Sequence, residues 1–172
     1  AKTAEAALKA GADVLNDIWG LQYAAEPGEM AQAAAAAGCP IVVMHNQDSK
    51  TYDRDIIASM QEFFRRTIRL ADEAGIDRQN LILDPGIGFG KTVEGNLEVL
   101  RRQQELLSID GEDYPLLLGT SRKSFMGKTL DLPVDERMET TGATCVLGIA
   151  KGAAIVRVHD VRETVQALAV WR

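Results

Sequence analysis

Short apolar runs alternate along the chain with longer amphipathic or alanine-rich stretches. The short runs are continuously apolar, which indicates parallel strands buried on both faces of a sheet. The longer stretches have helical periodicity, and several end in a glycine, as helices commonly do. The predicted strands are residues 14–16, 41–44, 81–83, 115–118 and 154–158. The predicted helices are residues 2–10, 29–37, 55–74, 93–107, 137–151 and 161–171.

Polar side chains follow every predicted strand. Doubly wound sheets and (β/α)₈ barrels are both built from such βα units, and both bind ligands at the carboxyl ends of their strands. Asn, Asp and Ser also favour helix caps and turns, so each residue taken alone also fits a structural role. The gathering as a whole predicts a ligand site made of Asn16, Asp17, His45, Asn46, Asp84, Thr120, Ser121, Arg122, Lys123, Arg157 and His159.

The segment DPGIGFGKT, residues 84–92, carries neither of the common phosphate-binding motifs. Lys91 stands where a dinucleotide fingerprint needs its third glycine, and Pro85 stands where a Walker A loop needs its first. What remains is a strand-end carboxylate, Asp84, followed by a glycine turn that carries Phe89. Such a carboxylate can accept paired N–H groups from a guanidine-like heterocycle. A simple βα turn with Phe89 in the core is the alternative.

Composition and charge narrow the class of partner. The chain has 172 residues, a formal charge of -6 and a pI near 5.0, which argues against nucleic acid or an anionic membrane as the main partner. Cys39 and Cys145 are far apart and lack zinc or redox spacing, so both are predicted to be buried thiols. We find neither an apolar run of about 18 residues nor a signal peptide, and expect a cytoplasmic location.

The segments LILDPGIGFGK, LLLGTSRKSFMG and AIVRVHDV occur in this order along the chain. Together they resemble the signatures of the dihydropteroate synthases, pterin-binding enzymes of folate synthesis with a TIM-barrel fold. KTAEAALKAGADVLNDIWG also resembles the helix and fourth strand of this family, and VVMHN its fifth strand, so the resemblance covers essentially the whole chain. It implies an α/β fold, a (β/α)₈ barrel that is incomplete here. One pterin-binding domain, residues 1–172, would supply strands 4–8, and the N-terminal strands would be missing.

The resemblance also assigns a pterin pocket. Asn16, Asp84, Lys123 and Arg157 would line it, with Asp84 receiving the 2-amino and ring N–H groups and Lys123 reaching the polar edge of the ring. Arg157 would stack on the pterin, and together with His159 it would meet the pyrophosphate leaving group. The implied catalytic residues are therefore Lys123, Arg157 and His159.

The second substrate has its own implied residues. Ser121, with the N-terminus of the helix opened by SRKS, would hold the carboxylate of p-aminobenzoate. Sulfonamide inhibitors would compete for the space bounded by Phe89, Ser121 and Lys123. His45 is interpreted as pocket scaffolding. The family resemblance further implies Mg²⁺, whose protein ligand would lie in the missing N-terminal segment, and a homodimer formed through the later helices.

The implied reaction condenses 6-hydroxymethyl-7,8-dihydropterin pyrophosphate with p-aminobenzoate to give 7,8-dihydropteroate and pyrophosphate. It needs no covalent nucleophile, and the sequence contains no nucleophile-elbow GxSxG and no Cys–His pairing. The alternatives are a non-catalytic remnant, a pterin-dependent corrinoid methyltransferase and a generic TIM-barrel phosphate-binding protein. SRKS followed by RVHD argues against the methyltransferase. We expect this chain alone to be inactive, because a TIM barrel typically needs about 250 residues.

Overall fold

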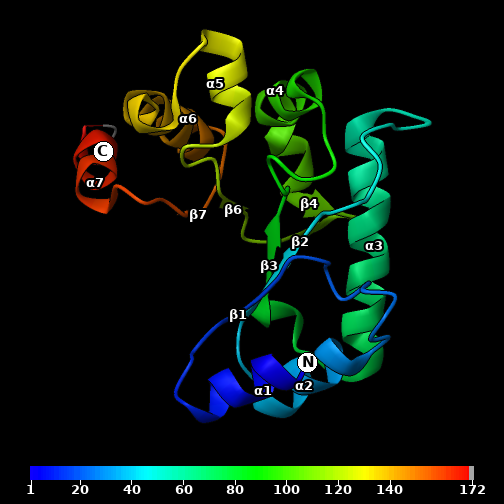
Figure 1. Cartoon of the computed structure of the whole chain (residues 1–172). Coiled ribbons are helices and arrows are strands. Elements are labelled where there is room, and N and C mark those ends of the chain that lie inside the picture. The colour runs from blue at the N-terminus through cyan, green and yellow to red at the C-terminus, as the bar shows by residue number, and fades with distance from the viewer. Residues whose placement is uncertain (171–172) are drawn as a thin grey trace.

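Five strands of the molecule are parallel and neighbour one another in a single order. The computed structural model describes residues 1–170. Strands β1, β2 and β3 form one sheet, β6 and β7 form a second pair, and a parallel bridge between Leu83 and Leu116 links the two (Figure 1). The order is thus β1-β2-β3-β6-β7. These strands are β1 (Leu15–Asp17), β2 (Ile41–Met44), β3 (Leu81–Asp84), β6 (Leu117–Leu118) and β7 (Ile155–Val156).

Helices connect successive strands, as expected for parallel pairing. In Figure 1, α1 and α2 lie at one end of the row of strands, α3 runs along its side, and α4 to α7 lie toward the other end. The helices are α1 (Lys2–Lys9), α2 (Glu29–Ala37), α3 (Ile56–Ala74), α4 (Val93–Arg102), α5 (Ser124–Leu130), α6 (Met138–Ala150) and α7 (Val161–Ala169). Three short 3₁₀ helices are η1 (Arg78–Asn80), η2 (Gln103–Leu106) and η3 (Val134–Glu136).

The core lies between the central strands and the long helix α3. All four residues of β2 are buried, which explains its continuous apolar sequence. From α3, Ile57, Met60 and Phe64 are fully buried in the same cluster. Full burial of one such side chain contributes about 1.5–3 kcal/mol, so this interface is the main source of rigidity beneath the strand ends.

The two ends of α3 follow rules that are visible in the sequence. The Asp55 side chain accepts a hydrogen bond from Ala58 N at 3.0 Å, and Gly75 ends the helix with a φ of +80°. Only a residue without a side chain adopts that left-handed conformation at little cost. Asp55 also binds Arg102 of α4, which lowers the pKa of its carboxyl group and connects two neighbouring helices.

The predicted α/β fold with parallel strands is confirmed, and the differences from prediction are local. The helix predicted over 93–107 stops at Arg102 and continues as η2. An antiparallel hairpin, β4 (Ser108–Ile109) with β5 (Glu112–Asp113), follows it and was not predicted. Its turn is Asp110–Gly111, a sequence that favours such hairpins. Cys145 is buried as predicted, but Cys39 is only half-buried because it lies in the loop after α2. The last residue of the helix predicted over 161–171 lies outside the described residues.

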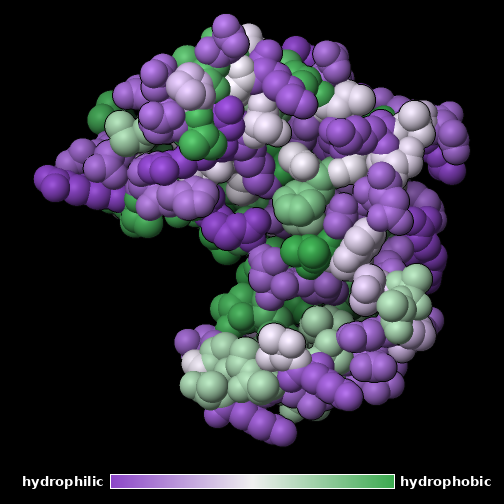
Figure 2. Space-filling model, in the orientation of Figure 1, coloured by the Kyte–Doolittle hydropathy of each residue, from purple (hydrophilic) through white to green (hydrophobic). Residues whose placement is uncertain are grey.

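Both ends of the row of strands are open. Within residues 1–170, β1 pairs only with β2, and β7 only with β6. Figure 2 shows the molecule hollowed between the two ends. Exposed apolar side chains on or next to these elements are Val14, Ile18, Ile155, Val161 and Val165. No helix within residues 1–170 is both long enough and apolar enough to cross a membrane.

Candidate functional site

Side chains from the first, third and last parallel strands meet at the carboxyl ends of these strands. The Arg157 guanidinium donates to Asn16 Oδ1 at 2.6 Å and to Asp84 Oδ2 at 3.0 Å. Asn16 and Arg157 are 141 positions apart in the chain. The fold therefore brings together three of the residues that the sequence predicted for one pocket.

Asp84 is a buried carboxylate with two protein partners. Its side chain is 1% exposed, whereas that of Arg157 is 44% exposed, so the ion pair is open to solvent on one side only. Gly86 N donates to Asp84 Oδ1 at 2.8 Å. A Cβ atom at Gly119 would lie 2.8 Å from an Arg157 nitrogen, so the absence of a side chain there makes room for the guanidinium. The arrangement compensates a buried charge, which would otherwise be costly.

The turn after β3, residues 86–90, is called the glycine loop below. Lys123 donates from Nζ to the carbonyl of Ile87 in this loop. The same ammonium lies 4.8 Å from the centre of the Phe89 ring, a cation–π distance. Burial lowers the pKa of Lys123 to about 8, with Asp84 opposing the shift and Arg157 adding to it. Lys123 is therefore mostly protonated at neutral pH, and the nearby Asp84 carboxylate favours this charged form.

Ser121 and His159 form a pair that joins the loops after β6 and β7. Ser121 Oγ lies 2.7 Å from His159 Nδ1 and accepts a hydrogen bond from His159 N at 3.1 Å. Helix α5 begins at Ser124 with Lys123 as its N-cap, so Ser121 lies before the helix rather than in its first turn. The Ser121 hydroxyl is committed to His159 in this structure.

A two-pronged ion pair joins the same two loops. Arg122 donates to both carboxylate oxygens of Asp160, at 3.1 and 2.6 Å, and lowers the pKa of that carboxyl group. Arg122 has a φ of +55°, and its backbone N–H donates to Thr141 Oγ1 at 3.0 Å. The pair holds Ser121 and His159 at their separation. Sequence reasoning placed Arg122 at a strand end but assigned it no role.

Lys91 is the functional candidate that sequence reasoning missed. It appeared there only as the residue that breaks a dinucleotide motif. In the structure it is 4% exposed, and its Nζ lies 3.0 Å from His45 Nδ1, 3.0 Å from the carbonyl of Gly86 and 3.1 Å from that of Phe89. Burial lowers its pKa to about 7. The available signal was a lysine directly after a glycine-rich, strand-end turn.

Asp17 supports the site without facing a ligand. Its carboxylate accepts the backbone N–H of Trp19 at 3.0 Å and that of Leu21 at 2.6 Å. Leu21 has a φ of +65°, and these two hydrogen bonds hold the turn that contains it. The turn follows Asn16 directly, so Asp17 fixes the backbone immediately after the residue that contacts Arg157.

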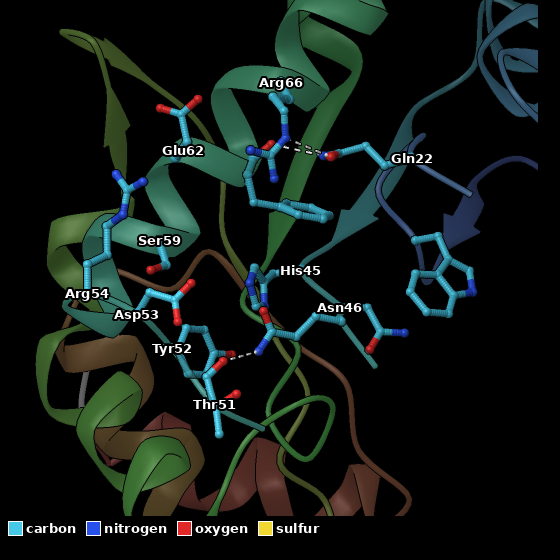
Figure 3. A pocket seen from close by; sticks show the side chains of 13 residues that line it. Gln22, His45, Asn46, Thr51, Tyr52, Asp53, Arg54, Ser59, Glu62 and Arg66 are labelled. Carbon is cyan, nitrogen blue, oxygen red and sulfur yellow. Dashed lines mark hydrogen bonds between the residues drawn. The ribbon is translucent and has the colours of Figure 1, made fainter. Parts of the chain in front are cut away.

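A polar cavity of about 360 Å³ lies beside the carboxyl end of β2 (Figure 3). Its walls include His45, Tyr52 and Arg66, whereas none of Asn16, Asp84 and Arg157 lines it. The Tyr52 ring is stacked on His45, and its hydroxyl donates to the carbonyl of Gly90 at 2.9 Å. Tyr52, which lines this cavity, is thus hydrogen-bonded to the glycine loop.

No group of three or more His, Cys, Asp or Glu side chains within residues 1–170 is arranged to hold a metal ion. In the main site, Asp84 is the buried carboxylate, and both of its oxygens already accept hydrogen bonds. Its neighbours are the cationic Lys123 and Arg157, which repel a divalent cation. The described residues therefore do not fit a magnesium site by themselves.

A buried carboxylate, an amide and two cations thus lie together at the carboxyl ends of the parallel strands. A family model described as "Pterin binding enzyme" matches residues 1–159. The chain belongs to this family of pterin-binding enzymes.

Individual relatives carry a more specific name. The dihydropteroate synthase of Bacillus subtilis is 49% identical over 163 residues, which are 95% of this chain and 55% of that protein. A dihydropteroate synthase crystal structure from Clostridium difficile in the presence of pteroic acid has a TM-score of 0.92 at 46% identity, covering 99% of this chain and 62% of that one. A Yersinia pestis dihydropteroate synthase structure with a sulfonamide drug has a TM-score of 0.89 at 39% identity, covering 98% and 61%. The chain spans little more than half the length of the curated relatives it matches.

Proposed function

We propose that this chain forms the pterin-binding part of a dihydropteroate synthase, which joins 6-hydroxymethyl-7,8-dihydropterin pyrophosphate to p-aminobenzoate. The observation that carries the proposal is the buried Asp84 carboxylate, contacted by Arg157 and near Lys123, at the ends of parallel strands. The relatives named above support it, and one of those structures was obtained with pteroic acid.

Asp84 is the proposed anchor of the pterin. A pterin carries a 2-amino group and a ring N–H side by side, and a carboxylate can accept both in charge-assisted hydrogen bonds. Asn16 supplies an amide at the same end of the pocket, and Lys123 a cation for the polar edge of the ring. Arg157 is half-exposed and can stack on the ring face.

The second substrate would lie between Phe89, Ser121 and Lys123. The carboxylate of p-aminobenzoate would be held next to Ser121 and the start of α5, where backbone N–H groups and Lys123 favour an anion. Because Ser121 is hydrogen-bonded to His159, we propose that its hydroxyl holds this region in shape as well as contacting the ligand. Sulfonamides, which imitate p-aminobenzoate, would compete for the same space.

Catalysis would rest on positioning and charge. The bond between the exocyclic methylene carbon and the pyrophosphate oxygen breaks, the aryl amine nitrogen bonds to that carbon, and the amine loses a proton. Lys123, Arg157 and His159 would stabilise the negative charge that develops on the departing pyrophosphate. Mg²⁺ would assist the leaving group from residues outside this chain, since those described here do not form its site.

The chain would contribute strands 4–8 of a (β/α)₈ barrel, with residues 1–172 as one domain. The unbroken parallel order and the two open ends support this arrangement. We further propose a homodimer through α6, which leaves Leu147 exposed, and a cytoplasmic location. A non-catalytic remnant is the second candidate.

The test is isothermal titration calorimetry with pteroic acid and with p-aminobenzoate. It is carried out on the wild-type chain and on Asp84→Asn. An amide offers one acceptor oxygen where the carboxylate offers two, so the variant should lose about 2–4 kcal/mol of pterin binding free energy. Asp113→Asn, an exposed residue of the β4–β5 hairpin, is the matched control. Unchanged pterin affinity in Asp84→Asn would contradict the proposed pocket. A wild type that binds neither ligand would favour the remnant.

A further inference from the structure

The glycine loop is held at its start and in its middle by the side chains of Asp84 and Asn96. At its start, Gly86 N donates to Asp84 Oδ1 at 2.8 Å. In its middle, Gly88 N donates to Asn96 Oδ1 at 2.6 Å. A Cβ atom at Gly86 would lie 2.0 Å from the carbonyl oxygen of His45, so the loop passes against the end of β2. Its conformation therefore decides where the Asp84 carboxylate points.

Lys91 closes this loop from beneath. Its Nζ contacts the carbonyl of Gly86 at the start of the loop and that of Phe89 near its end, at 3.0 and 3.1 Å. The third contact is to His45 Nδ1, outside the loop, at 3.0 Å. One buried amine thus joins both ends of the loop to the end of β2. The side chain is 4% exposed, and its hydrogen bonds go to the loop and to His45 rather than to Asn16, Asp84 or Arg157.

His45 is suited to be the acceptor for this amine. Its ring packs edge-on against Phe63, with 4.9 Å between ring centres, and is stacked on Tyr52 at 6.2 Å. Burial, assisted by the charge of Lys91, holds the pKa of His45 well below its ordinary value. The ring is therefore neutral, and Nδ1 can accept a hydrogen bond from an ammonium group.

We propose that Lys91 is a positioning residue for the pterin pocket: anchored on neutral His45, it holds the glycine loop closed and so sets the positions of Asp84 and Phe89. The proposal rests on the proposed pterin site and adds to it a residue that does not touch the ligand. His45 takes part in the same arrangement as the hydrogen-bond partner of Lys91.

Several charged and titratable groups surround Lys91 and influence the pKa of its amine. Asp84 attracts its proton and Lys123 repels it, while burial has the largest effect and lowers the pKa to about 7. His45 is neutral, and burial raises the pKa of Tyr52 to about 12, so the phenol also stays neutral. Below pH 7, Lys91 has three N–H donors for its three partners. Above pH 7 it has two, so one of its three contacts must break or exchange donor and acceptor.

The first measurement needs no ligand. Backbone N–H signals of Gly86, Gly88 and Gly90 are followed by NMR from pH 5.5 to 9 in the wild-type chain. We expect a common transition near pH 7, absent from Lys91→Met. Lys128→Met, an exposed lysine on α5, is the control and should retain the transition. Wild-type glycine signals that do not change between pH 6 and 8 would contradict the proposal, even if Lys91→Met fails to fold.

The second measurement is the dissociation constant for pteroic acid across the same pH range. Lys91→Met should bind at least about ten-fold more weakly at pH 6, and its affinity should lack the wild-type change near pH 7. A variant whose loop signals change but whose affinity stays within two-fold of the wild type would show that Lys91 is structural only. A wild type that does not bind pteroic acid would overturn the proposed function, whereas the glycine signals would still decide whether Lys91 holds the loop.

Discussion

Two lysines of the site lie in surroundings that disfavour the charged ammonium group. Both nevertheless make their proposed contacts through that group. Lys123 and Lys91 have pKa values lowered to about 8 and about 7, and in each case burial is the main cause. Their carbonyl and imidazole partners limit the cost of burying an ammonium group. Lysine fits this use better than arginine, because its pKa moves readily on burial.

The lowered pKa of Lys91 predicts a particular dependence of stability on pH. Between pH 7 and 10 the unfolded chain binds a proton at this position that the folded chain has released, so the free energy of unfolding rises with pH in that window. The increase is up to about 1.4 kcal/mol per pH unit. The difference between wild type and Lys91→Met, measured by urea denaturation, isolates this effect from that of Lys123. A difference that is constant between pH 7 and 10 would be inconsistent with a buried lysine.

Phe89 and Ser121 separate the two proposed substrates. Both are proposed to lie on the p-aminobenzoate side, and neither contacts Asp84 or Asn16 by a hydrogen bond of its side chain. Phe89→Ala and Ser121→Ala should therefore weaken sulfonamide binding by several-fold and pterin binding less. Competition between a sulfonamide and p-aminobenzoate on the chain, beside a direct pterin titration, measures both. Equal losses for the two ligands would mark these residues as structural.

Helix α6 packs so closely on β6 that a single methyl group matters. A Cβ atom at Gly148 would lie 2.3 Å from a terminal methyl of the buried Leu118, whereas one at Gly142 of the same helix would meet nothing within 4 Å. Gly148→Ala should lower the free energy of unfolding by about 1–3 kcal/mol through overpacking. Gly142→Ala should raise it by up to about 1 kcal/mol through helix propensity. Thermal unfolding compares the pair, and equal effects would contradict the close packing.

The elements that sequence predicted well are those with one dominant local cause. β2 is central and continuously apolar, and α2 ends in a glycine, so both have the predicted bounds. The β4–β5 hairpin was missed because two-residue strands carry no periodicity, although Asp110–Gly111 was a usable turn signal. Pocket residues such as Asp84 stand out as polar groups after buried strands. Lys91 could not be found this way, because its partners are backbone carbonyls and a histidine 46 positions earlier.

The open ends of the strand row decide what the chain can do alone. Unpaired strand edges and exposed apolar side chains favour association with other chains. The Arg157 side chain is also 44% exposed, so its side of the site is open to water, which weakens charge stabilisation of a leaving group.

We therefore predict that residues 1–172 retain part of the pterin affinity but form no dihydropteroate at a full-enzyme rate. The assay supplies the pterin pyrophosphate, p-aminobenzoate and Mg²⁺. It is run on the chain alone, then with the portion of the Bacillus subtilis relative that this chain does not match, added as a separate polypeptide. Activity should rise, and light scattering should fall, when that portion is present. Full activity of the chain alone would mean that five parallel strands suffice.

The Arg157 side chain is hydrogen-bonded to the atoms that are proposed to bind the pterin. Its guanidinium donates hydrogen bonds to Asp84 Oδ2 and to Asn16 Oδ1. A heterocycle that takes Asp84 Oδ2 would displace the Arg157 guanidinium, and this would release one cation on the side where pyrophosphate would leave. Binding of the pterin at Asp84 and release of the cation that would stabilise the leaving group would then be the same exchange of hydrogen-bond partners. Comparing the Asp84–Arg157 distance in free and pterin-bound crystals would reveal this exchange, and an unchanged distance would refute it.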